Sequence, residues 1–136
     1  MRLCACLGVA MDIIEPCGFL LNDRNLRRAG MDYLSGVDLT RHASWEEFRG
    51  QKPGRLLLLT TKASTPYFEF SFAPSDTLLV GRESAGVPDQ VHQAADVRLT
   101  IPMRAGMRSL NVAQAAAMVL GEALRQTALF PESAAP

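Results

Sequence analysis

The stretch RLLLLTT, residues 55–61, decides the fold of this 136-residue chain. Its run of leucines shows no alternation between apolar and polar residues, which is typical of a strand covered on both faces. Two runs of the same kind follow it, TLLVG (77–81) and VRLTIP (97–102). Because continuous apolar strands belong to parallel sheets, the three runs predict an α/β fold with a mainly parallel sheet.

Helices are predicted between and around these strands. Pro88 can begin a helix over residues 88–95, and an apolar segment from about Asn111 to Gln126 predicts the last helix. Nearer the N-terminus we expect the end of a helix at 2–8, a strand at 9–14, a short helix at 22–30, a strand at 37–39 and a helix that begins with the capping-box pair Ser44 and Glu47. This alternation predicts helices on both faces of the sheet. We expect one domain, 1–136, with a frayed tail at 127–136.

The composition excludes several classes of protein. At 48% hydrophobic and 21% charged residues the chain is neither disordered nor fibrous. Its formal net charge of zero argues against a general nucleic-acid coat, although a local basic face remains compatible with that sum. No apolar run approaches the roughly 20 residues that span a bilayer. Cys4, Cys6 and Cys17 form no C-x-x-C pair, which favours free thiols, no metal site and a cytoplasmic protein.

Three loops follow the predicted strands: LTTKAST (59–65), GRESAGVP (81–88) and IPMRAGMRSLN (101–111). Ligands of such sheets bind beyond the carboxyl ends of the strands. The second loop carries Gly81 and Gly86, which let a backbone approach a ligand closely. No dinucleotide or triphosphate fingerprint is present, so a nucleoside-like ligand held by backbone groups is favoured. A structural turn with a solvated Arg82–Glu83 pair explains the same residues equally well.

Arginines dominate the third loop and its approach. Arg98, Arg104 and Arg108 occur without any acidic residue between positions 97 and 108. Ser109 stands where a helix begins and is a candidate N-cap, and an arginine-rich loop beside a helix start attracts phosphates. With this loop, three further arginines predict a track for a phosphate backbone: Arg24, Arg27 and Arg28. No nucleophile–base pair is evident, which ranks covalent catalysis low.

The second and third loops resemble a known family. LLVGRESAGVP (78–88) and IPMRAGMRSLNVAQAAAMVLGEALRQ (101–126) resemble the second and third signature motifs of SpoU-type ribose 2'-O-methyltransferases, in the SPOUT class of RNA methyltransferases. DIIEPCGF (12–19), LRRAGMDY (26–33) and LTTKAS (59–64) are similar to the small members that methylate the wobble nucleotide of certain leucine tRNAs. The resemblance extends over nearly the whole chain.

This resemblance implies a C-terminal trefoil knot, S-adenosyl-L-methionine as cofactor, a tRNA substrate and a homodimer whose last helices pack together. Cofactor contacts would fall on Leu59, Gly81, Ile101 and Ser109. Glu83, Ser109 and Asn111 match active-site positions, and Arg2 matches an arginine of the first motif. Because a guanidinium is a poor base, we expect Arg2 to orient a phosphate and stabilise developing alkoxide charge. The RNA-binding candidates are Arg24, Arg27, Arg28, Arg104 and Arg108.

The family pattern places a strand and a loop before the helix that carries Arg2. We therefore expect this chain to lack roughly 15 to 20 residues of that pattern. Cofactor contacts come from the C-terminal half, so cofactor binding would persist where catalysis is impaired. Three alternatives stay open: a catalytically impaired dimeric tRNA-binding relative, a 2'-O-methyltransferase for another tRNA or rRNA site, and a flavodoxin-like nucleotide-binding domain.

Overall fold

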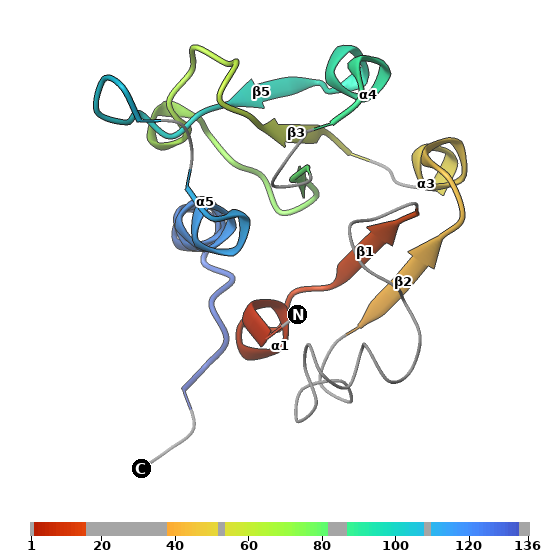
Figure 1. Cartoon of the computed structure of the whole chain (residues 1–136). Helices are drawn as coiled ribbons and strands as arrows, with labels where there is room; N and C mark the ends of the chain where they lie inside the picture. Colours follow the sequence, from red (N-terminus) through yellow and green to blue (C-terminus); the bar gives the residue numbers. More distant parts are fainter. Residues whose placement is uncertain (1, 16–37, 52–53, 82–86, 108–109, 134–136) are drawn as a thin grey trace. The chain divides into compact units, whose positions relative to one another are not determined.

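The computed structural model describes residues 2–15, 38–51, 54–81, 87–107 and 110–133 (Figure 1). The chain divides into two compact units, which we call unit 1 (Met1–Lys52 with Phe130–Pro136) and unit 2 (Pro53–Leu129). The elements of unit 1 are α1 (Arg2–Leu7), β1 (Met11–Ile14), β2 (Leu39–His42) and α3 (Trp45–Gln51). Those of unit 2 are β3 (Leu56–Leu59), the 3-10 helix η2 (Tyr67–Glu69), β4 (Thr77–Leu79), α4 (Asp89–Ala94), β5 (Val97–Leu99) and α5 (Val112–Thr127).

Unit 1 is built on a parallel pair of strands. Met11 pairs with Leu39 and Ile14 with His42, so β1 and β2 run in the same direction. The predicted helix end at Gly8 is confirmed, because α1 ends at Leu7 and Gly8 has a φ of 65°. The predicted strand at 9–14 is confirmed as β1 over its last four residues.

The capping pair predicted for α3 is confirmed. The Glu47 N–H donates to Ser44 Oγ at 3.2 Å. The Glu47 carboxylate turns back and accepts a 2.8 Å hydrogen bond from the N–H of Ala43, one residue before the cap. Both bonds satisfy backbone donors that a helix start leaves unpaired. The following apolar residues then face inward, with Phe48 only 2% exposed.

One strand of unit 1 was placed too early by the sequence pattern. The prediction of 37–39 overlaps the strand only at Leu39, because β2 spans Leu39–His42. Thr40 and Arg41 of this strand are exposed, and its buried residue is a histidine. The predicted helix at 22–30 lies outside the described residues.

Unit 2 contains a parallel sheet in the order β4-β3-β5, which confirms the predicted parallel pairing. Leu57 and Leu58 of β3 are each 1% exposed and Leu99 of β5 is fully buried, as expected for strands covered on both faces. The strands are shorter than the apolar runs predicted. Beyond Leu99, for example, Thr100 leaves β3 and forms a bridge with Pro66.

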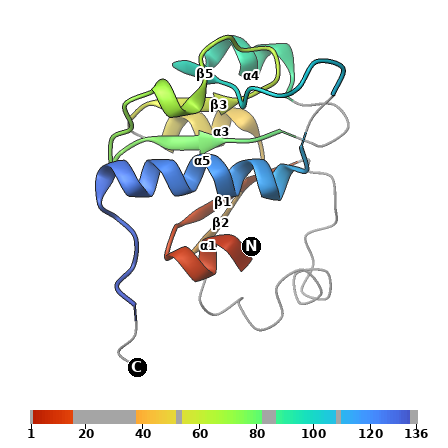
Figure 2. The same cartoon turned by 90° about the vertical axis from the view of Figure 1, so that its left-hand side faces the viewer.

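The helices of unit 2 begin and end near the predicted residues. Pro88 is the N-cap of α4, one position before its first helical residue. The long helix α5, seen lengthwise in Figure 2, ends at Thr127 with Ala128 in the left-handed conformation. Its N-cap is Asn111, whose Oδ1 accepts from the N–H of Ala113 at 2.9 Å. The expectation that Ser109 caps this helix is therefore wrong. The trefoil knot and the single-domain organisation stay predictions.

Candidate functional site

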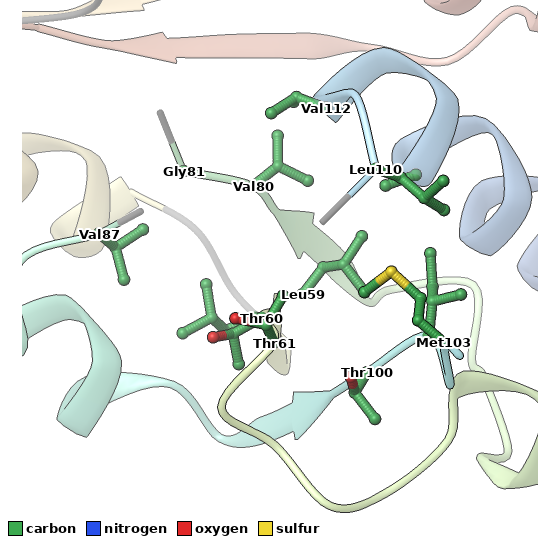
Figure 3. A pocket seen from close by; sticks show the side chains of 13 residues that line it. Leu59, Thr60, Thr61, Val80, Gly81, Val87, Thr100, Met103, Leu110 and Val112 are labelled. Atoms are coloured by element: carbon green, nitrogen blue, oxygen red, sulfur yellow. The ribbon is translucent and has the colours of Figure 1, made fainter. Parts of the chain in front are cut away.

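A pocket of about 200 Å³ opens in unit 2 where the three strands of its sheet end (Figure 3). It is lined by residues from the end of β3, the segments after β4 and β5, and the start of α5: Leu58, Leu59, Thr60, Thr61, Val80, Gly81, Val87, Thr100, Ile101, Met103, Leu110, Val112 and Ala115. The three loops predicted to collect at the carboxyl ends of the strands therefore do meet. This is the usual position for a ligand in an open parallel sheet.

Three of the four residues predicted to contact a cofactor line this pocket. Leu59 is the last residue of β3, Gly81 lies two residues after β4, and Ile101 lies two residues after β5. The fourth, Ser109, lies outside the described residues, although Leu110 lines the pocket. Their contact with a cofactor stays a prediction, but the fold brings these distant positions to one surface.

The chemistry of the pocket wall is neutral. None of the lining residues that the structure describes is ionisable, and their polar side chains are the hydroxyls of Thr60, Thr61 and Thr100. Ile101 is only 8% exposed, and within the described part of the chain its backbone N–H and C=O have no hydrogen-bond partner. Such groups need a partner when a ligand excludes water. The wall therefore suits a flat, largely apolar group with hydrogen-bonding edges, such as a nucleobase.

None of the predicted polar site residues that the structure describes lines this pocket. Asn111 follows the pocket-lining Leu110, and its Oδ1 is occupied by the helix cap. Arg104 is exposed in the segment after β5, whereas Arg2 is exposed at the start of α1 in unit 1. Their roles in catalysis and RNA binding stay predictions. Glu83, Ser109, Arg24, Arg27, Arg28 and Arg108 lie outside the described residues.

Arg98 does not lie in the arginine-rich loop with which the sequence pattern groups it. Arg98 belongs to β5, and its guanidinium donates to the backbone carbonyls of His92 and Gln93 at 2.8 and 3.2 Å. It therefore binds the end of α4 instead of joining an arginine cluster in the loop.

The sequence reasoning missed several pocket residues. Val87 precedes α4, and Met103 follows β5 by four positions, with neither carrying a polar signal. Met103 is 36% exposed and Leu110 is 39% exposed. An apolar side chain that stays exposed in a loop predicted to bind a ligand is the signal that could have identified these pocket residues.

The described residues offer little for metal or thiol chemistry. They contain no cluster of three histidine, cysteine or acidic side chains that could hold a metal ion. Cys4 and Cys6 are free thiols, and burial raises the pKa of Cys4, which makes it a poor nucleophile. None of the described helices is long and apolar enough to cross a membrane.

Residues 1–121 match the model of the SpoU rRNA methylase family. A Beijerinckia indica protein named tRNA (cytidine(34)-2'-O)-methyltransferase is 64% identical over 129 residues, which cover 93% of this chain and 81% of that protein. The resemblance seen in the motifs is thus confirmed along most of the chain.

Solved structures share the fold. One, from work on 2-OH methylation of C/U34 on tRNA, matches with a TM-score of 0.85 at 38% identity, covering 92% of this chain and 83% of that one. The SpoU methyltransferase AviRb from Streptomyces viridochromogenes, in complex with AdoMet, matches with a TM-score of 0.76 at 27% identity, covering 92% of this chain and 53% of that one.

Proposed function

This chain belongs to the SpoU rRNA methylase family, and we propose that it transfers a methyl group from S-adenosylmethionine to the ribose 2'-hydroxyl of nucleotide 34 of tRNA. The target nucleotide follows from the relatives named for cytidine 34 and from the neighbouring structure concerned with C/U34. We further propose that leucine tRNAs are the substrates and that the enzyme acts in the cytoplasm.

The observation that carries this proposal is the pocket at the ends of β3, β4 and β5, whose described lining residues are uncharged. Leu59, Gly81 and Ile101 line it, and these are the positions that the family motif assigns to cofactor contacts. At about 200 Å³ it is smaller than the roughly 300–1,000 Å³ of a typical ligand site, so it accommodates part of the cofactor. The backbone groups of Ile101, which have no hydrogen-bond partner among the described residues, and the apolar wall fit the adenine.

When bound, S-adenosylmethionine supplies an electrophilic methyl group on a sulfonium. The described lining residues, which are apolar or hydroxyl-bearing, then orient that cofactor and exclude water. We assign charge stabilisation to Arg2, as a hydrogen-bond donor to a phosphate and to the developing alkoxide. Glu83, Ser109 and Asn111 complete the proposed set of active-site residues.

We propose that the exposed arginines bind the tRNA backbone, with Arg104 as the described member of a set that includes Arg24, Arg27, Arg28 and Arg108. We also propose a homodimer formed through α5. Met118 of this helix is 43% exposed although apolar, which supports a covered helix face. Analytical ultracentrifugation of the chain and of Met118→Glu tests the dimer, and a monomeric parent chain would contradict it.

The deciding experiment is methyl transfer from labelled S-adenosylmethionine to bulk tRNA and, in a parallel assay, to ribosomal RNA, followed by digestion and mapping of the 2'-O-methylated nucleotide. Label at nucleotide 34 of leucine tRNAs is the expected result. Label at another tRNA position, or only in ribosomal RNA, would retain the chemistry and overturn the target. Cofactor binding and tRNA binding without transfer would indicate an RNA-binding relative, and failure to bind the cofactor would overturn the proposal.

A further inference from the structure

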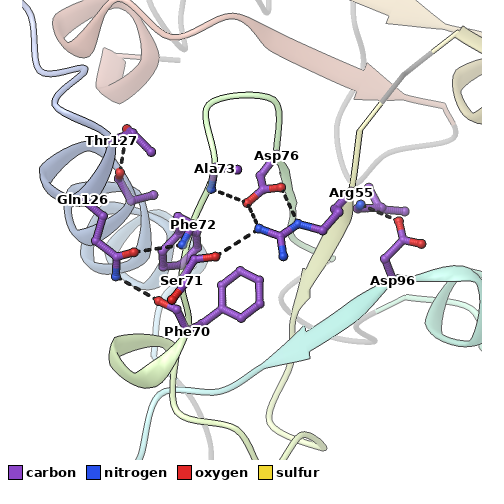
Figure 4. Close-up of polar contacts among 11 residues, drawn as sticks. Arg55, Phe70, Ser71, Phe72, Ala73, Asp76, Asp96, Gln126 and Thr127 are labelled. Carbon is purple, nitrogen blue, oxygen red and sulfur yellow. Dashed lines mark hydrogen bonds and ion pairs between the residues drawn. The ribbon is translucent and has the colours of Figure 1, made fainter.

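The last turn of α5 is joined to a distant segment of unit 2 by one side chain. The Gln126 amide accepts a 2.8 Å hydrogen bond from the N–H of Phe72 at Oε1 and donates a 2.9 Å hydrogen bond from Nε2 to the carbonyl of Phe70 (Figure 4). The amide thus pairs with two alternate backbone groups, as a neighbouring strand would. We call these two hydrogen bonds the Gln126 clasp.

The segment held by the clasp is itself fixed to the start of β3. Arg55, which directly precedes β3, donates from Nη2 to the carbonyl of Ser71 at 3.0 Å. Its guanidinium also binds Asp76 through two hydrogen bonds of 2.8 and 2.7 Å and lies 4.7 Å from the centre of the Phe70 ring. Asp76 accepts a further hydrogen bond from the N–H of Ala73. The clasp therefore joins α5 to an anchored segment (Figure 4).

Both elements joined by this network contribute to the pocket at their opposite ends. Arg55 stands before β3, whose last residue, Leu59, lines the pocket. Gln126 is in the last turn of α5, whose first residue, Val112, also lines the pocket. The helix has 16 residues, about 24 Å at roughly 1.5 Å per residue. A rigid helix carries a shift at one end to the other.

Apolar packing and hydrogen bonding both contribute to the axial position of such a helix. Val119 and Leu124 of α5 are buried, but burial of apolar surface is non-directional. Within the described part of the chain, the clasp supplies the only side-chain hydrogen bonds from α5 to another segment of unit 2. Hydrogen bonds have narrow requirements for distance and angle, so they select one position of the helix.

We infer that Gln126 is a positioning residue for the cofactor pocket: the Gln126 clasp holds α5 so that its first turn stays against the ends of the strands. This inference rests on the proposed function for the identity of the ligand. It adds a residue remote from the pocket to those that determine cofactor affinity.

The test compares Gln126→Met with the parent chain. Methionine retains the length and helix propensity of glutamine but forms neither hydrogen bond of the clasp. We expect the Kd and KM for S-adenosylmethionine to rise about three- to tenfold, with less than a twofold change in kcat. Without cofactor, amide hydrogen exchange over 112–116 should become faster by a similar factor, because the first turn opens more often.

A matched control separates positioning from general stability. Thr127 donates from its hydroxyl to the carbonyl of Ala123 within α5, next to Gln126, and among the described residues it forms no hydrogen bond to the 70–72 segment. Thr127→Val removes that hydrogen bond and should lower the melting temperature without changing cofactor affinity or exchange over 112–116. If Gln126→Met fails to fold, Gln126→Leu replaces it, because leucine also forms neither hydrogen bond of the clasp, retains helix propensity and places no charge beside Glu122.

The outcomes are distinct. Unchanged Kd and unchanged exchange in a folded Gln126 variant would overturn the inference, as would an equal loss of affinity in Thr127→Val. A parent chain that binds no S-adenosylmethionine would overturn the proposed function. In that case the exchange experiment, which needs no ligand, still decides whether Gln126 positions the first turn of α5.

Discussion

The guanidinium of Arg98 donates a 2.8 Å hydrogen bond to the backbone carbonyl of His92, close to the end of α4. The carbonyls at a helix end lack partners within the helix and carry partial negative charge, so a cation there is favourable. Arg104, by contrast, is exposed in the segment that follows β5. Arg98 is therefore bound to a helix end, whereas Arg104 is exposed, although only six positions separate them in the sequence.

We predict that substitutions of these two arginines separate stability from RNA binding. Arg98→Gln should lower the free energy of unfolding by about 0.5–2 kcal/mol and leave tRNA affinity unchanged. Arg104→Gln should leave stability unchanged, weaken tRNA binding and reduce the slope of log K against log salt by about one. Urea unfolding and binding at several salt concentrations measure both effects. An unaltered salt slope in Arg104→Gln would contradict its contact with a phosphate.

His42 forms the buried polar centre of unit 1. It is 1% exposed, and its Nε2 lies 2.8 Å from Asp12 Oδ1. Because a carboxylate only accepts hydrogen bonds, Nε2 carries the proton. The ring also meets Phe48 edge-on, with 5.2 Å between centroids. Its Nδ1 is buried without a hydrogen-bond partner among the described residues. The favourable packing of the ring therefore outweighs the cost of leaving this nitrogen unpaired.

We predict that His42→Ala destabilises the protein by about 2–4 kcal/mol, because it removes a buried hydrogen bond, leaves a cavity and loses the aromatic contact. Thr40→Ala is the matched control, since Thr40 is exposed on the same strand and should change stability by about 0.5 kcal/mol or less. Denaturant unfolding followed by tryptophan fluorescence reports on Trp45 in the adjacent helix. Equal stabilities of the two variants would show that the His42–Asp12 contact contributes nothing net.

The acid stability of α5 depends on Glu122. Hydrogen bonds from Arg125, and then from Gln126, lower the pKa of Glu122 from 4.5 to about 2. A folded-state pKa below the unfolded value means that the ionised group stabilises the fold above the unfolded pKa. That contribution is lost as the pH falls through the folded pKa.

We therefore predict that the stability difference between the parent chain and Glu122→Gln is constant near neutral pH. It should begin to shrink below about pH 4.5 and nearly vanish by about pH 2. Because the Arg125 side chain is 68% exposed, salt should reduce the difference further. Urea midpoints measured at a series of pH values give the result. A difference that grows toward acid pH would contradict the sign of this pKa shift.

Local pattern predicted the strands of unit 2 because each apolar run is buried on both faces, as Leu57 and Leu58 show. It misplaced β2 because that strand exposes Thr40 and Arg41 and buries a histidine. The partner of His42 is Asp12, thirty residues away. The spacing of apolar residues along a short segment carries no information about a contact thirty residues away. The bounds of this strand could therefore be found only through its tertiary pairing.

The pocket and its surroundings likewise include residues that the sequence predicts and contacts that it does not. Leu59, Gly81 and Ile101 could be brought together in advance, because the carboxyl ends of parallel strands meet at one edge of a sheet and the family motifs mark those positions. The Gln126 clasp could not be predicted, since its partners are separated by 54 and 56 residues and are backbone groups. The family motif marks Asn111 as an active-site position, and the structure also gives it the N-cap of α5.

The first turns of α5 allow a direct test of the pocket itself. Ala115 lines the pocket and is half-buried, whereas Ala113, two residues earlier, is exposed and does not line it. Leucine has nearly the helix propensity of alanine, so Ala115→Leu should retain α5 while its larger side chain fills space that the adenine would occupy. We predict at least a tenfold loss of affinity for S-adenosylmethionine, equivalent to about 1.4 kcal/mol, whereas Ala113→Leu should bind the cofactor as the parent chain does. Calorimetric titration measures the affinities, and circular dichroism verifies that both variants are folded. Parent-like affinity in a folded Ala115→Leu variant would place the cofactor elsewhere.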